Sequence, residues 1–514
     1  MPAEEQDIAR LLQDIKSTQD RVSADMEWLV RYQAGLDRRL GRVEDSVIFR
    51  SLRWIGRMYA HVFSRQTNAY TQWRKRGGGN LSQPMPAAKP RFTLLVQPAD
   101  RERITRAVQP YENCEVMVGD WAETVARSTG DYVAMVGKSD EVYAGALQHF
   151  AAVAGSPDLI YSDEELLDES CDPKAPRFKP GWSPVLLRSV NYLGGLTAIR
   201  RELAAGHADL LNAIRAHPGL SAVHVPAVLY GSRSNALPKP PVTPVPASSG
   251  ALVSLIVCTR TASLLEACLI GVQSATDFTP FEIIVVQHLG SSSAASEQAV
   301  AQVIAARGAK CVPYAAPFNF SAMNNLGAES ATGSILLFLN DDVTPLRPDW
   351  LRRMEAWLRV PEVGAVGAKL TFPDGRLQHS GIAAWMTDGA WHPGRNMPPH
   401  PNWPWTQYTR EVSAVTGACL AIRAADFRRL GGFDIAFPVN FNDVDLCFRL
   451  RREGFSIILD AEAELRHDES RTRSGGTSYE ERHAFFRKWR SELQRPDPFY
   501  TPHLAQNNED LSLR

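Results

Sequence analysis

Apolar residues recur at a strict interval of seven through the first 48 residues. The first position of this repeat is always apolar: Ile8, Ile15, Val22, Leu29, Leu36 and Val43. The position four residues later is apolar too, except at Gln19 and Gln33. Such a seam predicts a coiled-coil helix over residues 1–48 that self-associates or binds a partner protein, with the two glutamines fixing its register. A long helix lying on the protein's own body would show the same stripe.

A basic and aromatic segment follows at residues 49–76. It holds seven Arg and Lys residues and no acidic residue, and aromatic side chains are interleaved with them, Trp54 and Trp73 among these. This pattern is typical of a peripheral membrane contact on anionic lipid, and equally of a solvated basic helix followed by a loop. A Gly- and Pro-rich linker then completes residues 49–89.

Further along, short apolar runs alternate with helical patterns. The runs at 252–260, 281–286 and 335–340 predict buried strands, and the residues between them read as helices. This alternation indicates an α/β fold with a doubly wound, mostly parallel sheet and a crevice of nucleotide size. Residues 235–250 hold five prolines between 238 and 246 and predict a semi-rigid spacer before this domain, which we place at 251–476.

The chain also repeats itself. Residues 126–142 resemble residues 329–345, since in each a Thr-Gly pair leads into an apolar strand that ends in polar residues. Two further matches follow in the same order, which predicts a second, shorter domain of the same kind at 90–234. Gly137, Lys138 and Ser139 fall opposite Asn340, Asp341 and Asp342 in this comparison. The first domain is therefore predicted to be non-catalytic. Residues 477–514 are predicted to form a C-terminal helix and tail.

Composition narrows the class of protein. The formal net charge is −1 and 22% of the residues are charged, which gives no bias toward nucleic acid. The seven cysteines are scattered without a CxxC pair, which argues against a disulfide framework and a zinc site. The sequence shows no signal-peptide pattern at its start and no apolar run of the roughly 18 residues that a membrane span needs. We expect a cytoplasmic protein, free or attached to the inner face of the cytoplasmic membrane.

The strand "ILLFLN" at 335–340 runs directly into Asp341 and Asp342. Adjacent carboxylates repel each other, and each costs free energy when it is desolvated, so a cation is the usual remedy. Hard carboxylate oxygens suit Mg²⁺ or Mn²⁺. Two solvated turn residues would explain the pair as well. The sequence contains neither GxGxxG nor GxxxxGKS, so a diphosphate bound here would need a metal ion to offset its charge.

A second acidic element lies at residues 437–455. Asn442 is a suitable N-cap, and the pattern predicts a helix from Asp443 to Glu453 that ends at Gly454. Asp443 and Asp445 would occupy the first turn, where the helix dipole keeps a carboxylate ionised and able to accept a proton. Capping alone would also account for both acids. His467 follows a strand-like run and is a candidate metal ligand, although a lone histidine is more often structural.

Together these segments resemble the family 2 glycosyltransferases of the GT-A fold, particularly the branch that builds bacterial surface polysaccharides (O-antigen or capsule type). The resemblance covers nearly all of 251–514. Its motifs are "FNFSAMNNLG" (318–327), "ILLFLNDDV" (335–343), and the segments 361–382, 412–423, 431–454 and 463–470. Residues 157–168 and 178–195 of the first domain are similar to the family too, but that domain lacks the acidic motif. The implied architecture is a GT-A catalytic domain preceded by a truncated GT-A-like domain and a coiled-coil helix.

The resemblance also implies roles for individual residues. Asp342 and His467 become ligands of a divalent cation, Mg²⁺ or Mn²⁺, and Asp443 becomes the general base. The donor would be bound by Thr259, Arg260, Asn340 and Asp341, with Thr259 and Arg260 on the loop that meets the nucleotide. Asp445 and Trp391 are candidate acceptor contacts. Many relatives have an Asp where this chain has Gln287 and His288, which leaves the nucleotide undetermined.

The predicted function is an inverting transfer of a sugar from a nucleotide-diphosphate donor to a hydroxyl of a glycan, in particular a lipid-linked glycan of a bacterial surface polysaccharide. The alternative is a non-catalytic coiled-coil scaffold of a polysaccharide assembly complex. Retained acids at 341, 342 and 443 argue against the scaffold. A sugar nucleotidyltransferase would need a Gly-rich, basic phosphate loop near the first strand, and "VCTRTASLL" at 257–265 does not supply one.

Overall fold

The structure is a computed structural model that describes residues 66–79, 90–233, 243–277, 280–290, 292–385, 389–400, 403–468, 478–506 and 509–514. The chain divides into two compact units, Met1–Ala69 and Tyr70–Arg514, and the description below concerns the second. The predicted coiled coil at 1–48 lies outside the described residues. Within the part that is described, no helix is both long and apolar enough to cross a membrane.

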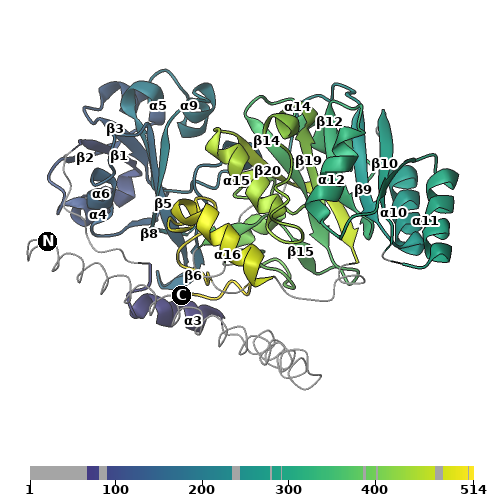
Figure 1. Ribbon diagram of the computed structural model, residues 1–514. Helices are drawn as coiled ribbons and strands as arrows, with labels where there is room; N and C mark the ends of the chain where they lie inside the picture. Colours follow the sequence, from purple (N-terminus) through teal and green to yellow (C-terminus); the bar gives the residue numbers. More distant parts are fainter. Residues whose placement is uncertain are drawn as a thin grey trace, which may run out of the picture. The chain divides into compact units, whose positions relative to one another are not determined.

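The larger sheet contains the carboxylate-bearing strand. Its strand order is β11-β10-β9-β12-β19-β14-β20-β13, with β15 beside β14 and β18 beside β20. Its strands are β9 (Val253–Thr259), β10 (Phe281–His288), β11 (Lys310–Tyr314), β12 (Ile335–Asn340), β13 (Val343–Pro345), β14 (Val363–Thr371), β15 (Leu377–His379), β18 (Arg410–Val412), β19 (Cys419–Arg423) and β20 (Ser456–His467). Strands β9 to β12 pair in parallel, whereas β19 runs antiparallel to both β12 and β14 (Figure 1).

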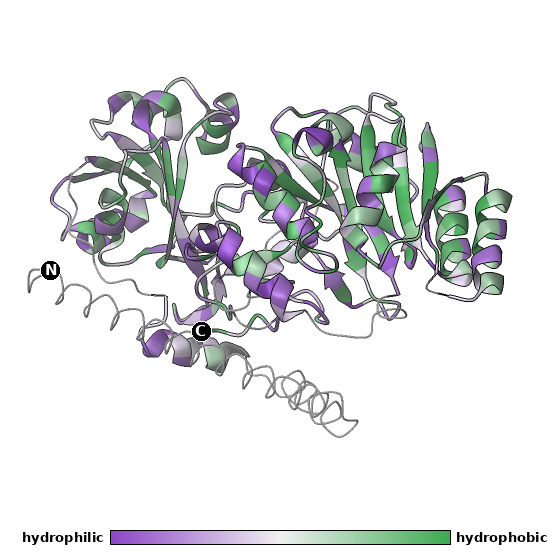
Figure 2. Ribbon diagram, viewed as in Figure 1, coloured by the Kyte–Doolittle hydropathy of each residue, from purple (hydrophilic) through white to green (hydrophobic). Residues whose placement is uncertain are grey.

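Helices cover both faces of this sheet. They are α10 (Ala262–Ala275), α11 (Ala294–Ala306), α12 (Phe320–Glu329), α13 (Trp350–Trp357), α14 (Ala424–Arg429), α15 (Asn442–Arg452), α16 (Tyr479–Lys488) and α17 (Arg490–Leu493). Leu255 of β9 packs in one core with α10 and α13, while the next residue, Ile256, packs in another with α12 and α15. Side chains alternate between the faces of a strand, so β9 is buried on both faces and mostly apolar, and the central strands are accordingly green in Figure 2.

A second sheet has the order β2-β1-β3-β7-β5-β8-β4, with β6 beside β5. Its strands are β1 (Phe92–Val96), β2 (Cys114–Val118), β3 (Tyr132–Met135), β4 (Glu141–Val142), β5 (Leu159–Leu167), β6 (Pro173–Arg177), β7 (Thr197–Arg200) and β8 (Ala222–Ser232). Its helices are α4 (Arg101–Val108), α5 (Trp121–Arg127), α6 (Ala146–Ala151), α7 (Pro184–Ser189), α8 (Arg201–Ala204) and α9 (Leu210–Ala216). Taken in chain order, these strands occupy the same places as those of the larger sheet, which has the additional strands β11 and β18.

The α/β class is therefore confirmed, but the expectation of a mostly parallel sheet is wrong. Both sheets are mixed, because β7 in one and β19 in the other run antiparallel to each of their neighbours. Alternating strands and helices predicted the parallel part, β9 to β12, correctly. Beyond β12 the chain passes from β14 to β19 through residues 372–418, whose described part contains no α-helix, and strands joined without a crossover helix can pair antiparallel.

The two sheets belong to one unit, and the loop at 390–405 lies between them. Trp405 donates its indole N–H to the carbonyl of Phe178, 2.7 Å away, and Gly181 N–H donates to the carbonyl of Pro498 at 2.8 Å. The Pro-rich linker is attached as well, since Thr243 is buried and donates its backbone N–H to Glu462 at 2.9 Å. The described part of the predicted spacer thus packs on the half that contains the larger sheet.

Helix α3 (Gln66–Lys75) includes the end of the basic, aromatic segment. The Tyr70 hydroxyl donates to Glu165 Oε2 at 2.6 Å, and Arg74 Nε donates to the same oxygen at 3.0 Å. Glu165 is fully buried in β5. Tyr70 and Arg74 therefore bind the protein's own first sheet, and residues 49–65 of the segment lie outside the described residues.

Replacing Arg74 by Ala should destabilise the protein by about 3 kcal/mol, because it removes one partner of a buried ion pair. The buried Glu165 carboxylate then lacks the positive charge of Arg74. Urea unfolding followed by circular dichroism measures the loss. Lys75→Ala is the matched control, since the neighbouring Lys75 side chain is exposed and should be replaceable at little cost. Equal stability of the two variants would contradict the expectation.

Candidate active site

The two aspartates follow the last residue of β12. Asn340 N–H donates to the carbonyl of Ala418 at 3.0 Å, which joins the end of β12 to the start of β19. Asp341 Oδ2 accepts a hydrogen bond of 2.6 Å from the Thr259 hydroxyl at the end of β9. Burial raises the pKa of Asp341 to about 6; the Thr259 hydrogen bond opposes this rise and the charge of Asp342 adds to it.

Asp342 and His467 are brought together by strand pairing, because Val343 of β13 lies opposite His467 of β20. The distance from Asp342 Oδ1 to His467 Nε2 is 3.0 Å. The other ring nitrogen, Nδ1, lies 2.8 Å from the side-chain oxygen of Gln378 on β15. An amide oxygen only accepts, so Nδ1 carries a proton, and Nε2 on the other side of the ring faces Asp342.

A divalent cation fits this arrangement. Asp342 Oδ1 is buried and accepts no hydrogen bond, and it faces Nε2 of His467, an atom that can also bind a metal ion. Two such atoms repel unless a proton or a metal ion lies between them. Among the described residues no group of three or more His, Cys, Asp and Glu side chains could hold a metal. A site with two protein ligands suits Mg²⁺ or Mn²⁺ bound together with substrate phosphates.

The predicted start of the second acidic helix is wrong by one residue. Helix α15 spans Asn442–Arg452, and its N-cap is Phe441, in the left-handed region at φ 63°, with no side-chain cap. Asn442 is buried, and its amide donates to the carbonyl of Phe437 at 3.4 Å. The left-handed turn at Phe441 places Asn442 already inside the helix, where its side chain cannot cap. The end is close to the prediction, with Gly454 left-handed two residues beyond Arg452.

Asp443 lies in the first turn of α15, at the same end of β12 as Asp341 and Asp342. Its Oδ2 accepts a hydrogen bond of 2.7 Å from the backbone N–H of Gly417. Gly417 directly precedes Ala418, whose carbonyl binds the end of β12. A carboxylate held by a backbone donor at a helix N-terminus stays ionised and keeps a lone pair for a proton.

The two candidate acceptor contacts are in the interior. Asp445 is fully buried, and its carboxylate binds three donors: Arg449 Nε (2.8 Å), Trp489 Nε1 (2.9 Å) and Lys488 Nζ (2.6 Å). Trp391 is buried too, packing edge-on against Tyr500 at a centroid distance of 5.7 Å. Trp403 and Trp405 share this core. The tryptophans of the loop at 390–405 therefore pack inside the protein, and we propose no acceptor role for Asp445 or Trp391.

At the end of β9, Thr259 is buried against Asp341, and the following Arg260 is exposed. Gln287 donates to the carbonyl of Glu297 at 2.7 Å. A ring nitrogen of His288 lies 3.1 Å from the carbonyl of Ala316. Sequence reasoning missed Gln378 and Gly417, although both lie in segments that resemble the family. Neither carries a charge or a motif of its own, so only the fold reveals their contacts.

The sequence was compared with known proteins. Residues 250–484 match the family described as "Glycosyltransferase like family 2". This part of the chain belongs to glycosyltransferase family 2. The chain is 32% identical to the O-antigen biosynthesis protein RfbC of Myxococcus xanthus, over 82% of this chain and 37% of that protein. It is 31% identical to the uncharacterized protein y4gI of Sinorhizobium fredii, over 75% of this chain and 49% of that protein. The chain thus spans less than half the length of these two family 2 relatives.

Among solved structures, the family 2 chain is similar to the mannosyltransferase PcManGT of Pyrobaculum calidifontis in complex with GDP-Man and Mn²⁺. The identity is 20%, the TM-score is 0.34, and the match covers 45% of this chain and 61% of that one.

Proposed function

We propose that this chain is a glycosyltransferase that moves a sugar from a nucleotide-diphosphate donor to a hydroxyl of a glycan in the synthesis of O-antigen or a similar surface polysaccharide. Family membership supports the activity, and the printed name of the Myxococcus relative supports the process. The single observation that carries the proposal is the buried, unbonded Oδ1 of Asp342 facing His467 Nε2 beside Asp341 and Asp443. A lipid-linked acceptor at the inner face of the membrane is part of the proposal.

In this proposal Asp342 and His467 hold the divalent cation. When bound, the cation stabilises the negative charge that develops on the leaving diphosphate. Asn340 and Asp341 lie next to it and contact the ribose and the diphosphate. Thr259 holds Asp341 in place, and the exposed Arg260 directly follows β9, on the loop proposed to meet the nucleotide.

Asp443 acts as the general base. It takes the proton of the acceptor hydroxyl, the acceptor oxygen bonds to the anomeric carbon, and the bond from that carbon to the diphosphate oxygen breaks. Attack opposite the leaving group inverts the anomeric configuration. The hydrogen bond from Gly417 N–H keeps the Asp443 carboxylate aimed from α15 toward the end of β12.

The first sheet is proposed to be a non-catalytic domain of the GT-A kind. Gly137, Lys138 and Ser139 follow β3 where Asn340, Asp341 and Asp342 follow β12. The nearest carboxylate, Asp140, accepts a hydrogen bond of 2.7 Å from the buried Tyr230 and another from Arg233 N–H. Its oxygens are therefore bound by the protein itself. Self-association or partner binding through residues 1–48 remains part of the proposal.

A donor screen tests the proposal. Purified protein with Mn²⁺ or Mg²⁺ is offered nucleotide sugars, and release of UDP, GDP, TDP and CMP is followed. Metal-dependent release of one nucleotide is expected. No release, together with no metal-dependent thermal shift with any nucleotide, would contradict the enzyme and favour the scaffold.

Replacing Gln378 by Leu should weaken Mn²⁺ binding about 10- to 100-fold, because the His467 ring loses the acceptor that fixes its tautomer. Nε2 is then free to carry the proton and to donate it to Asp342. Titration of Mn²⁺ by electron paramagnetic resonance measures the affinity. Gln378→Glu is the control, since a carboxylate also accepts the Nδ1 proton. Unchanged affinity in the Leu variant would contradict this role of Gln378.

A further inference from the structure

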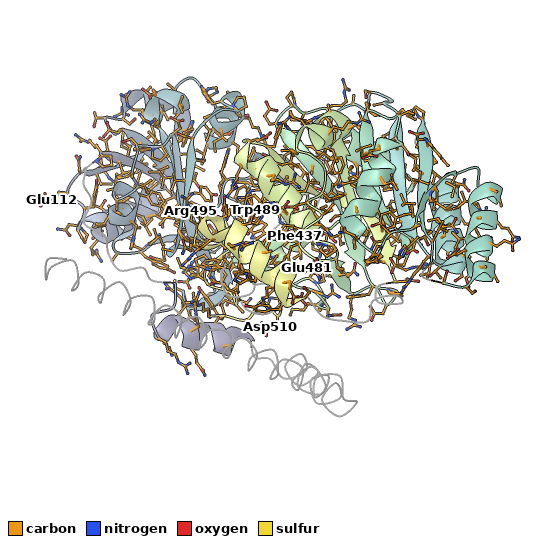
Figure 3. The ribbon with its side chains drawn as sticks, in the orientation of Figure 1. Glu112, Phe437, Glu481, Trp489, Arg495 and Asp510 are labelled. Atoms are coloured by element: carbon orange, nitrogen blue, oxygen red, sulfur yellow. The ribbon has the colours of Figure 1, made fainter. Side chains whose placement is uncertain are left out.

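Helix α16 holds the loop that leads into the helix bearing Asp443 (Figure 3). Glu481 of α16 is almost fully buried. Its Oε1 accepts hydrogen bonds from the backbone N–H groups of Val439 (2.7 Å) and Asn440 (2.9 Å), and its Oε2 accepts one of 2.8 Å from the Asn440 side chain. One carboxylate thus binds three donors of a single turn, the turn immediately before α15.

Aromatic contacts hold the same loop. The ring of Phe441, the left-handed residue before α15, stacks on Phe485 of α16 at a centroid distance of 4.4 Å and an interplanar angle of 12°. Phe437, at the beginning of the loop, packs edge-on against the same Phe485 at 6.2 Å. A non-glycine residue in the left-handed region is strained and persists only where its surroundings hold it. Here α16 supplies those surroundings.

The far end of α16 holds the other side of the same loop. Lys488 Nζ lies 2.7 Å from Asp434 and 2.6 Å from Asp445, and Trp489, which follows α16, donates its indole N–H to Asp445 at 2.9 Å. Asp434 precedes the loop and Asp445 is two residues beyond Asp443. The start of α15 has no side-chain cap of its own. Residues of α16 and the residue after it hold this end of the helix instead: Glu481 on one side of the loop, and Lys488 with Trp489 on the other.

We propose that Glu481 is a positioning residue that sets the place of Asp443 in the active site. The inference rests on the proposed function, in which Asp443 is the base. Glu481 acts through the turn Val439–Asn440–Phe441, whose first two backbone N–H groups it binds. A shift of about 1 Å in a base lowers turnover strongly, while the donor site on β9, β12 and β20 stays in place.

The experiment compares two neighbouring glutamates on α16. Glu481→Met keeps the length of the side chain but removes both oxygens that accept from the Val439 and Asn440 N–H groups. We expect kcat to fall at least tenfold, while donor KM and the affinity for Mn²⁺ with nucleotide change less than twofold. Glu480→Met is the control. Glu480 is exposed and bonds only Ser478 in the described structure, so kcat should stay near the wild-type value.

A conservative variant that restores activity distinguishes a positioning role of Glu481 from a general loss of stability. Glu481→Gln keeps one oxygen for the two backbone donors, and the Asn440 amide can turn to accept from the new amide. Its kcat should lie within about threefold of the wild-type value, and its Tm near that of wild type. A kcat in Glu481→Met equal to that of Glu480→Met would overturn the proposal, as would an equal loss in kcat and in donor affinity. Asp443→Asn is measured alongside: full activity in that variant would refute the base itself, independently of Glu481.

Discussion

Asp342→Ala should lower transfer by about 10³-fold or more and abolish metal-dependent nucleotide binding. The substitution removes the buried oxygen that faces His467 Nε2, and with it one of the two protein ligands proposed for the cation. Loss of a metal ion costs several kcal/mol of stabilisation of the charge that develops on the leaving group. Nucleotide release under saturating donor measures the rate, and a Mn²⁺ titration in the presence of the nucleotide measures binding.

Asp342→Asn separates loss of the metal from loss of the fold. The Asn amide can donate to His467 Nε2, which satisfies two atoms that otherwise face each other as acceptors. We therefore expect the Tm of Asp342→Asn in metal-free buffer to equal or exceed that of wild type, although its activity should be as low as that of Asp342→Ala. Substantial activity in the Asn variant would refute Asp342 as a metal ligand.

Part of the fold followed from the sequence for a clear physical reason. Strands β9 and β12 are buried on both faces, so they appear as uninterrupted apolar runs with polar residues at their carboxyl ends. The direction in which the strands after β12 pair could not be predicted from such apolar runs. "CLAIR" at 419–423 is apolar whichever way it runs, and only its tertiary partners, β12 and β14, determine that it is antiparallel.

The candidate site, like the fold, could be predicted from the sequence only in part. The sequence resemblance named Asp342 and His467, 125 positions apart in the chain, and the structure brings them within 3.0 Å. It could not reveal Gln378, because an uncharged residue three positions after Gly375 has no signal of its own. Asp445 shows the opposite error. The sequence suggests an acceptor contact at this acid, two residues from the candidate base, whereas in the structure Arg449, Lys488 and Trp489 bind it and make it an anchor of α15.

The loop at 390–405 shows why the acceptor side was the least predictable. Three tryptophans in a Pro-rich loop are typical of a surface on which sugar rings stack, and equally of a loop whose side chains are buried in the protein. The decision depends on whether another part of the chain covers them. Here Phe178 and Tyr192 of the first half share their core, so the first copy buries what would otherwise be an exposed aromatic surface. The sequence of the loop itself does not show that residues of the first half bury its tryptophans.

Asp443→Asn should lower kcat by about 10² to 10⁴-fold, the usual contribution of a general base, with donor KM and Mn²⁺ affinity nearly unchanged. The Asn side-chain oxygen can still accept from Gly417 N–H, so the start of α15 should keep its place. Steady-state kinetics with varied donor measures both constants, and Glu480→Gln, at an exposed acid of α16, is the control for surface charge. We expect metal binding to be lost in Asp342→Ala and retained in Asp443→Asn. That result would place Asp342 on the diphosphate side and Asp443 on the acceptor side of the sugar–diphosphate bond that breaks. An active Asp443→Asn variant would instead require the acceptor proton to leave by another group.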